Sequence, residues 1–87
     1  MKDIVEKAKS FIFRRQFAYQ STFQKGNVLA EEVLKDLASF CRAEETTFNL
    51  DPRVHAVLEG RREVFLRIQS HLNLSSDDLW KKYSKKE

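Results

Sequence analysis

Residues 51–72 read DPRVHAVLEGRREVFLRIQSHL, and their spacing predicts one long α-helix. Asp51 can accept hydrogen bonds from the free amide hydrogens of a first helical turn. Pro52 suits the first helical position, because its missing N–H would have no partner there. Apolar residues then recur every three or four positions, as the buried face of a helix requires: Val54, Val57, Leu58, Val64, Phe65, Ile68 and Leu72. We therefore expect a helix over residues 52–72.

The rest of the chain predicts further helices and no strands. Residues 27–42 start at Asn27, a good capping residue, and carry the cleanest amphipathic pattern of the sequence. Residues 3–20 have helical spacing with more than one apolar face, and Ser75 and Ser76 precede a short helix over 76–84. The expected fold is a small all-α domain of three to four helices.

Length and composition limit the architecture and the cellular location that we expect for the protein. At 87 residues, with 41% apolar and 33% charged residues, the chain fits a single domain over residues 1–87. It has no apolar run long enough to span a bilayer and no secretory signal pattern, and its lone Cys41 fits a reducing compartment. So short a chain has a small core, which self-association can complete.

The charges divide along the chain. Residues 1–26 carry six basic and two acidic side chains, whereas residues 27–50 carry two basic and five acidic ones. Because these segments can pair within the fold, the basic N-terminal segment does not by itself require an anionic partner.

No pattern of catalytic or metal-binding residues is found. His55 and His71 lie far apart on one helix, Cys41 belongs to an apolar face, and the acidic pairs fit helix starts or solvated surface. A glycine-rich phosphate loop is also missing. The sequence therefore predicts a protein that is not an enzyme, with no cofactor, no metal and no small-molecule substrate.

Aromatic and basic residues at the two ends are the candidate binding residues. Phe13 and Phe17 form a second apolar stripe on the first helix, which either meets a third helix or lies exposed for a partner. With neighbouring residues they make up the predicted protein-contact set: Phe13, Arg14, Phe17, Trp80 and Tyr83. The alternative is nucleic-acid binding, in which phosphates would be neutralised by lysines around Trp80 and Tyr83: Lys81, Lys82, Lys85 and Lys86.

A glycine and two arginines interrupt the long helix. In the middle of a helix, glycine is about 1 kcal/mol less favourable for stability than alanine. The presence of Gly60 therefore suggests that another part of the structure passes close to the helix backbone at this position. Arg61 falls in the apolar stripe, and we expect it to pin the loop over residues 43–50, with ligand binding as the alternative; Arg62 follows it. Phe48 and Leu50 are expected to fold back and help hold that loop.

These residues also carry a resemblance. The run from Val33 to Cys41, the Asp51-Pro52 helix start and the Gly60-Arg61-Arg62 element resemble a family of small proteins encoded among the head, packaging and tail genes of tailed bacteriophages, over about residues 19–79. The resemblance implies a phage context and brings no catalytic activity with it.

Together these observations predict a non-enzymatic virion-associated or assembly accessory protein that acts through protein contacts. Its expected partners are phage structural proteins or further copies of itself. The alternative is a small nucleic-acid-binding protein acting in packaging or on host DNA. We expect synthesis in the host cytoplasm, with the virion left open as a final location.

Overall fold

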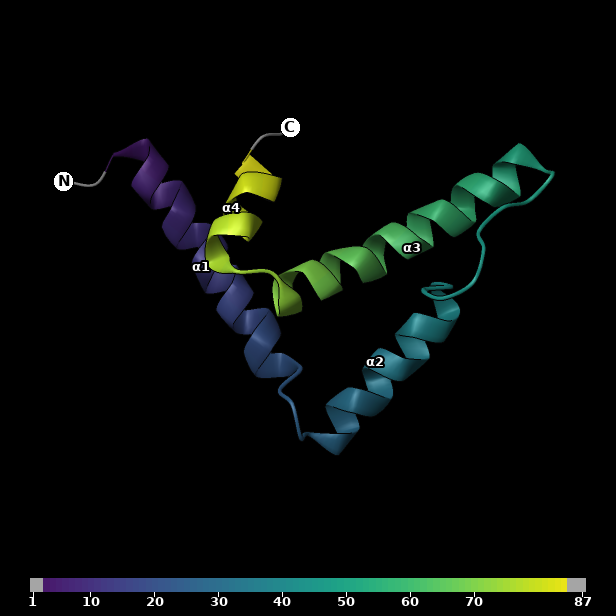
Figure 1. Ribbon diagram of the computed structural model, residues 1–87, viewed down its shortest axis with the longest axis horizontal. Coiled ribbons are helices and arrows are strands. Elements are labelled where there is room, and N and C mark those ends of the chain that lie inside the picture. The colour runs from purple at the N-terminus through teal and green to yellow at the C-terminus, as the bar shows by residue number, and fades with distance from the viewer. Residues whose placement is uncertain (1–2, 85–87) are drawn as a thin grey trace.

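The computed structural model describes residues 3–84, which form four α-helices (Figure 1). They are α1 (Ile4–Thr22), α2 (Val28–Phe40), α3 (Pro52–Asn73) and α4 (Ser76–Ser84). No strand occurs within the described residues, and the predicted all-α fold is confirmed. None of these helices combines the length and hydropathy needed to cross a membrane.

Each helix begins where a side chain caps it. The side chain of Asp3 accepts a hydrogen bond from the amide of Glu6, and Asn27 does the same for Ala30. Asp51 accepts from the amide of Arg53, with Pro52 in the first turn. The hydroxyl of Ser75 accepts from the amide of Asp78 at the start of α4. The helix starts read from the sequence are correct to within one residue because these caps are local signals.

The C-terminal end of α2 departs from the prediction. The helix stops at Phe40 rather than residue 42, because Arg42 adopts a left-handed backbone conformation with φ 53°. The amides of Arg42 and Ala43 donate to the carbonyls of Ser39 and Ala38, at 3.2 and 2.9 Å. This is a Schellman turn with arginine at the position that glycine usually occupies.

The helices spread out instead of closing into a bundle. In Figure 1, α1 and α2 form a V, and α3 runs back from the C-terminal end of α2 to α1, where α4 also lies. The molecule measures 52 × 33 × 14 Å, and its radius of gyration is 15.5 Å, against about 12 Å for a compact domain of this length. Most of the structure is therefore a single layer of helices.

The core is correspondingly small and divided. In the first half, Ile12 of α1 and Leu79 of α4 are buried. Here the side chain of Gln16 on α1 makes two hydrogen bonds. Its Nε2 donates to the carbonyl of Leu74 at 2.9 Å, and its Oε1 accepts from the hydroxyl of Ser76 at 3.0 Å, so it fixes the turn between α3 and α4. The second half buries Cys41, Leu58 and Phe65, whereas α2 itself has no buried residue.

The loop between α2 and α3 is held by polar contacts. Phe48 and Leu50 are 67% and 89% exposed, so the expectation that they fold back onto the core is wrong. Thr47 is buried instead: its hydroxyl donates to the carboxylate of Glu59, and its carbonyl lies 3.0 Å from Nδ1 of His55. A threonine in a polar loop gives no periodic signal that would mark it as buried.

Candidate functional site

His71 marks the point where three helices meet. It lies near the C-terminal end of α3 and is fully buried. The ring of Tyr19 from α1 stacks on it with centroids 4.2 Å apart, and the ring of Tyr83 from α4 stacks at 5.2 Å. One imidazole thus joins α1, α3 and α4, although we did not single it out from the sequence as more than an isolated histidine.

The hydrogen bonds of His71 fix its protonation state. Nε2 accepts from Nε of Arg15 at 2.9 Å, and Nδ1 lies 2.8 Å from the carbonyl of Arg67. A guanidinium only donates and a carbonyl only accepts, so the ring is neutral with its proton on Nδ1. Burial lowers the pKa of His71, and the charges of Arg15, Arg67 and Lys82 act in the same direction, against the bond to the Arg67 carbonyl, which raises it.

Cations gather on the aromatic rings around this histidine. Arg15 and Arg67 place their guanidinium carbons 5.4 and 4.9 Å from the centroid of the Tyr83 ring. Lys82 lies 5.7 Å from the same ring and donates to the hydroxyl of Ser70 at 2.7 Å. We call this group of three aromatic rings and three cations the cationic aromatic cluster: Tyr19, His71, Tyr83, Arg15, Arg67 and Lys82. The cluster also includes a pair between α1 and α4, in which Nζ of Lys9 lies 5.5 Å from the centroid of the Trp80 ring.

The predicted contact residues fall partly in this cluster. Trp80 and Tyr83 are half-buried within it, so each offers only part of its ring to a partner. On α1, Phe13 is half-buried, Arg14 is exposed and Phe17 is 71% exposed. The aromatic stripe of the first helix is therefore divided, and Phe17 does not meet a third helix.

The lysines of the alternative prediction lie on α4 and beyond it. Lys81 and Lys82 are exposed, whereas Lys85 and Lys86 lie outside the described residues. Arg67 was not identified from the sequence as a member of the basic group, whereas Arg15 lies with Arg14 among the aromatic residues of the first helix. Arg15 did give a signal, because a charged residue within an apolar stripe requires a polar partner in the core.

The glycine and two arginines of α3 act differently from the prediction. Arg62, not Arg61, pins the loop: its Nη1 donates to the carbonyls of Arg42 and Glu45, at 3.3 and 3.1 Å. Arg61 is exposed, with its guanidinium carbon 4.5 Å from the centroid of the Phe40 ring. Nothing lies within 4 Å of where a Cβ on Gly60 would be, so the expected close backbone approach is absent at that position.

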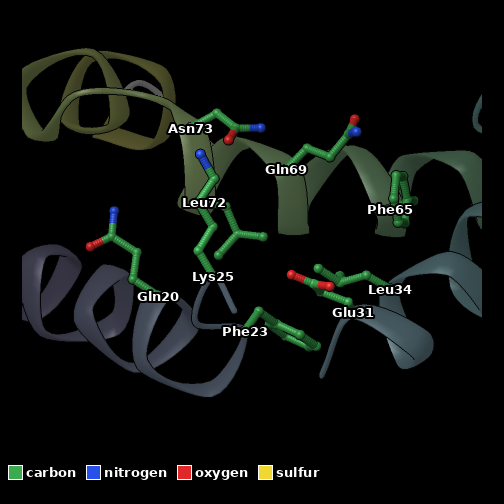
Figure 2. A pocket seen from close by; sticks show the side chains of 9 residues that line it. All are labelled: Gln20, Phe23, Lys25, Glu31, Leu34, Phe65, Gln69, Leu72 and Asn73. Carbon is green, nitrogen blue, oxygen red and sulfur yellow. The ribbon is translucent and has the colours of Figure 1, made fainter. Parts of the chain in front are cut away.

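A pocket of about 480 Å³ lies where the end of α1, the start of α2 and the C-terminal half of α3 meet (Figure 2). Apolar side chains line it together with three side-chain amides, one from α1 and two from α3, one ammonium group and one carboxylate. That carboxylate, Glu31, accepts from the amide of Gly26 at 3.2 Å. In the described part of the chain, no three His, Cys, Asp or Glu side chains converge in a way that could hold a metal ion.

A second surface feature lies on α2 and α3. Besides Val28 at the start of α2, five large apolar side chains of these helices are each half or more exposed: Leu29, Val33, Phe40, Val57 and Val64. Because Arg61 of α3 covers the ring of Phe40 of α2, both helices contribute to the same side of the layer. We call these five residues the α2–α3 apolar face.

The fold and its surfaces define a class of protein: a small all-α protein with a divided core and many exposed apolar side chains. Residues 13–82 match the family of Bbp19-like phage proteins, and the chain belongs to that family. No curated protein and no solved structure has a detectable match to it. The protein is therefore phage-associated, in line with the resemblance read from the Asp51-Pro52 and Gly60-Arg61-Arg62 elements.

Proposed function

We propose that this phage protein is a non-enzymatic accessory of the virion or of its assembly, and that it acts by binding phage structural proteins. The observation that carries the proposal is the open single layer, which leaves fourteen large apolar side chains exposed among the described residues. Exposed apolar surface on this scale is typical of proteins that bind other proteins. We also propose that the protein is made in the host cytoplasm and is carried into the virion.

Phe17 is the side chain of α1 best placed for such a contact. It is 71% exposed, next to the half-buried Phe13 and near the exposed Arg14. Aromatic and arginine side chains contribute most to binding energy at protein interfaces. We therefore assign Phe13, Arg14 and Phe17 to the contact with a structural protein, with the exposed parts of Trp80 and Tyr83 at its margin.

Binding of the purified chain to individually expressed phage head, portal and tail proteins tests this function, together with mass spectrometry of purified virions. We expect one of these proteins to bind, and Phe17→Glu to weaken that binding about tenfold or more. Lys7→Glu, an exposed charge change on the same helix, serves as the control. Absence from virions combined with no binding to any structural protein would refute the proposal.

The cationic aromatic cluster favours a second candidate function, binding of nucleic acid. Its cations lie over or beside aromatic rings, an arrangement that suits phosphate neutralisation and base stacking. This function predicts binding to single-stranded DNA whose affinity falls steeply with salt. Replacing Lys9 and Lys81 by glutamine would reduce the salt dependence by about two counterions, whereas Lys35→Gln on α2 would not.

A further inference from the structure

Three cations of the cationic aromatic cluster converge on a single ring. The guanidinium carbons of Arg15 and Arg67 and the Nζ atom of Lys82 lie 5.4, 4.9 and 5.7 Å from the centroid of the Tyr83 ring. The three cations come from α1, α3 and α4, so the fold brings together charges that are far apart in the sequence. Charges of one sign that converge in this way repel one another, and an anion placed among them is stabilised.

Two of these cations pass over a carboxylate on their own helix. Glu63 precedes Arg67 by one helical turn and Asp78 precedes Lys82 by one turn, which is the order that favours an ion pair on a helix. Neither pair forms within residues 3–84, and both cations lie beside the ring of Tyr83 instead. Their positive charge is therefore free to meet a ligand.

The third cation has a partner without charge. Nε of Arg15 donates to Nε2 of His71 at 2.9 Å, and this imidazole is neutral and fully buried. The bond satisfies one donor of the half-buried guanidinium and does not balance its charge. Its Nη groups have no acceptor in the described part of the chain. They can donate to an anion.

An aromatic pocket of about 380 Å³ opens beside the same cations. It lies between α1 and α4, and the guanidinium of Arg15 lines it together with the rings of Phe11, Trp80 and Tyr83. Phe11 is 65% exposed and Trp80 is half-buried, so both rings can be reached from outside. Aromatic side chains placed in this way stack with flat rings such as nucleobases.

A second pocket, of about 540 Å³, adjoins the first at Tyr83. It lies between α3 and α4, and Arg67 and Lys82 line it. The carboxylate of Glu63 also lines this pocket and pairs with neither cation within residues 3–84. Since Tyr83 lines both pockets, an aromatic surface and a cationic surface meet at one residue. A nucleotide has the matching parts, because its base is flat and uncharged and its phosphate is an anion.

We propose that the cationic aromatic cluster binds one nucleotide unit. The phosphate group is held by Arg15, Arg67 and Lys82. The base enters the pocket lined by Phe11 and Trp80. An acidic protein segment would use the cations and leave this aromatic pocket empty, so the pocket favours a nucleotide.

The unit belongs either to a single strand or to a free nucleotide, which share this chemistry. The inference goes beyond the protein contact assigned to α1. It rests on the second candidate function, nucleic-acid binding, because it names the unit that the chain recognises and the residues that hold each part of it.

The fluorescence of Trp80, the chain's single tryptophan, tests the site directly. We expect adenosine 5′-monophosphate to quench this fluorescence in a saturable way, because its base stacks in the pocket. Adenosine lacks the phosphate and is expected to bind about tenfold or more weakly. Inorganic phosphate is expected to compete with the mononucleotide. Failure of the mononucleotide to quench, or equal binding of adenosine, would overturn the inference.

Arg67→Gln tests the cationic part of the site. It removes one exposed cation and leaves the main-chain carbonyl that faces His71, and we expect it to weaken binding of the mononucleotide about tenfold. Arg61→Gln is the matched control, because Arg61 is also an exposed arginine of α3 that lies beside an aromatic ring. Circular dichroism checks that both variants fold. Equal binding by the two variants would contradict the assignment of the phosphate.

Phe11→Ala tests the aromatic part. We expect it to weaken binding of the mononucleotide about tenfold and to leave the thermal stabilisation by inorganic phosphate unchanged. Phe48→Ala is the control, since Phe48 is an equally exposed phenylalanine in the loop at the opposite end of α3 (Figure 1). Loss of the stabilisation by phosphate in Phe11→Ala would contradict the separate roles of the two pockets.

A single strand of about eight deoxyadenylates separates the two sources of the unit. Binding of the strand that is about tenfold tighter than that of the mononucleotide, and that falls with salt, assigns the unit to nucleic acid. A strand that binds no more tightly per nucleotide assigns it to a free nucleotide, which supports the inference and refutes nucleic-acid binding as the function.

The remaining outcomes overturn the inference. Strand binding that Arg67→Gln and Phe11→Ala leave unchanged would keep nucleic-acid binding and remove this site. Binding of polyglutamate that Arg67→Gln weakens, with no binding of mononucleotide or strand, would assign the cations to an acidic protein segment. None of these results alters the test of binding to phage structural proteins.

Discussion

His71 is a neutral, buried ring between two tyrosines, and three cations from three helices surround it: Arg15 of α1, Arg67 of α3 and Lys82 of α4. The environment that holds these helices together therefore also opposes a further positive charge. A proton on Nε2 would remove the hydrogen bond from Arg15 and place two like charges in contact. The stability of the junction thus depends on pH.

We expect the free energy of unfolding to fall as the pH drops below about 6.5, the ordinary pKa of histidine. The pKa of His71 is lowered in the folded state, so below this pH the unfolded chain binds a proton that the folded chain does not. Above it, this contribution to stability is fully present. Urea unfolding at about pH 7.5 and about pH 5.5, roughly one unit either side of 6.5, measures this change in the free energy of unfolding.

The test variant is His71→Gln. It is expected to be less stable at neutral pH, because the stacked ring is lost, and to show a flatter pH dependence. An unchanged slope in His71→Gln would contradict this assignment.

The two adjacent arginines of α3 make a second contrast between single residues. Arg62→Ala removes two charge-assisted hydrogen bonds to the loop and is expected to cost about 1 to 2 kcal/mol. Arg61→Ala removes one exposed cation–π contact, which is worth about 0.5 to 1 kcal/mol. Thermal unfolding of the two variants measures both losses. Equal losses would indicate that the loop is not held by Arg62.

Among the elements, the residues at which helices start were predictable from the sequence, and the contacts that each helix makes with the rest of the chain were not. Asn27, Asp51 and Ser75 signal their helices through bonds that span three residues, which a sequence displays directly. The pinning by Arg62 depends on the path of an irregular loop. Helical periodicity places Arg61 in the apolar stripe and so favoured the wrong arginine, because it carries no information on where that loop passes.

The candidate sites show the same limit. Trp80 and Tyr83 were identified from their basic neighbours, which are local in sequence. The sandwich of His71 joins Tyr19 and Tyr83, which are far apart in the chain, and no spacing rule reports it. The exposed stripe of α2 was read as an ordinary core face, since periodicity shows which side is apolar and not whether a neighbour covers it.

The two glycines give a prediction about the elements they belong to. Gly60 lies within α3 with open space around its Cα, so Gly60→Ala is expected to stabilise the protein by about 0.5 to 1 kcal/mol. Gly26, between α1 and α2, has φ 88°, so Gly26→Ala is expected to destabilise it by about 1 kcal/mol or more. Chemical denaturation of both variants provides the comparison. A loss of stability in Gly60→Ala would reveal a contact at that position in the assembled protein.

At the scale of the whole molecule, stability is expected to be uneven. The junction of α1, α3 and α4 buries His71, Leu79 and Gln16, whereas α2 buries no residue of its own. Local opening is easiest where few side chains are buried. In hydrogen exchange at low protein concentration, we therefore expect the amides of α2 to exchange first and those of the C-terminal half of α3 last. Equal protection of both would contradict the division of the core.

Cys41 ends α2 and is only 4% exposed, and it is the chain's one sulfhydryl group. An alkylating reagent reaches this buried sulfur only after the structure around it has opened, so the rate of modification measures how often that opening occurs. If the region opens on its own, alkylation is faster than global unfolding allows. A covalent reaction at one atom then reports the stability of one part of the fold.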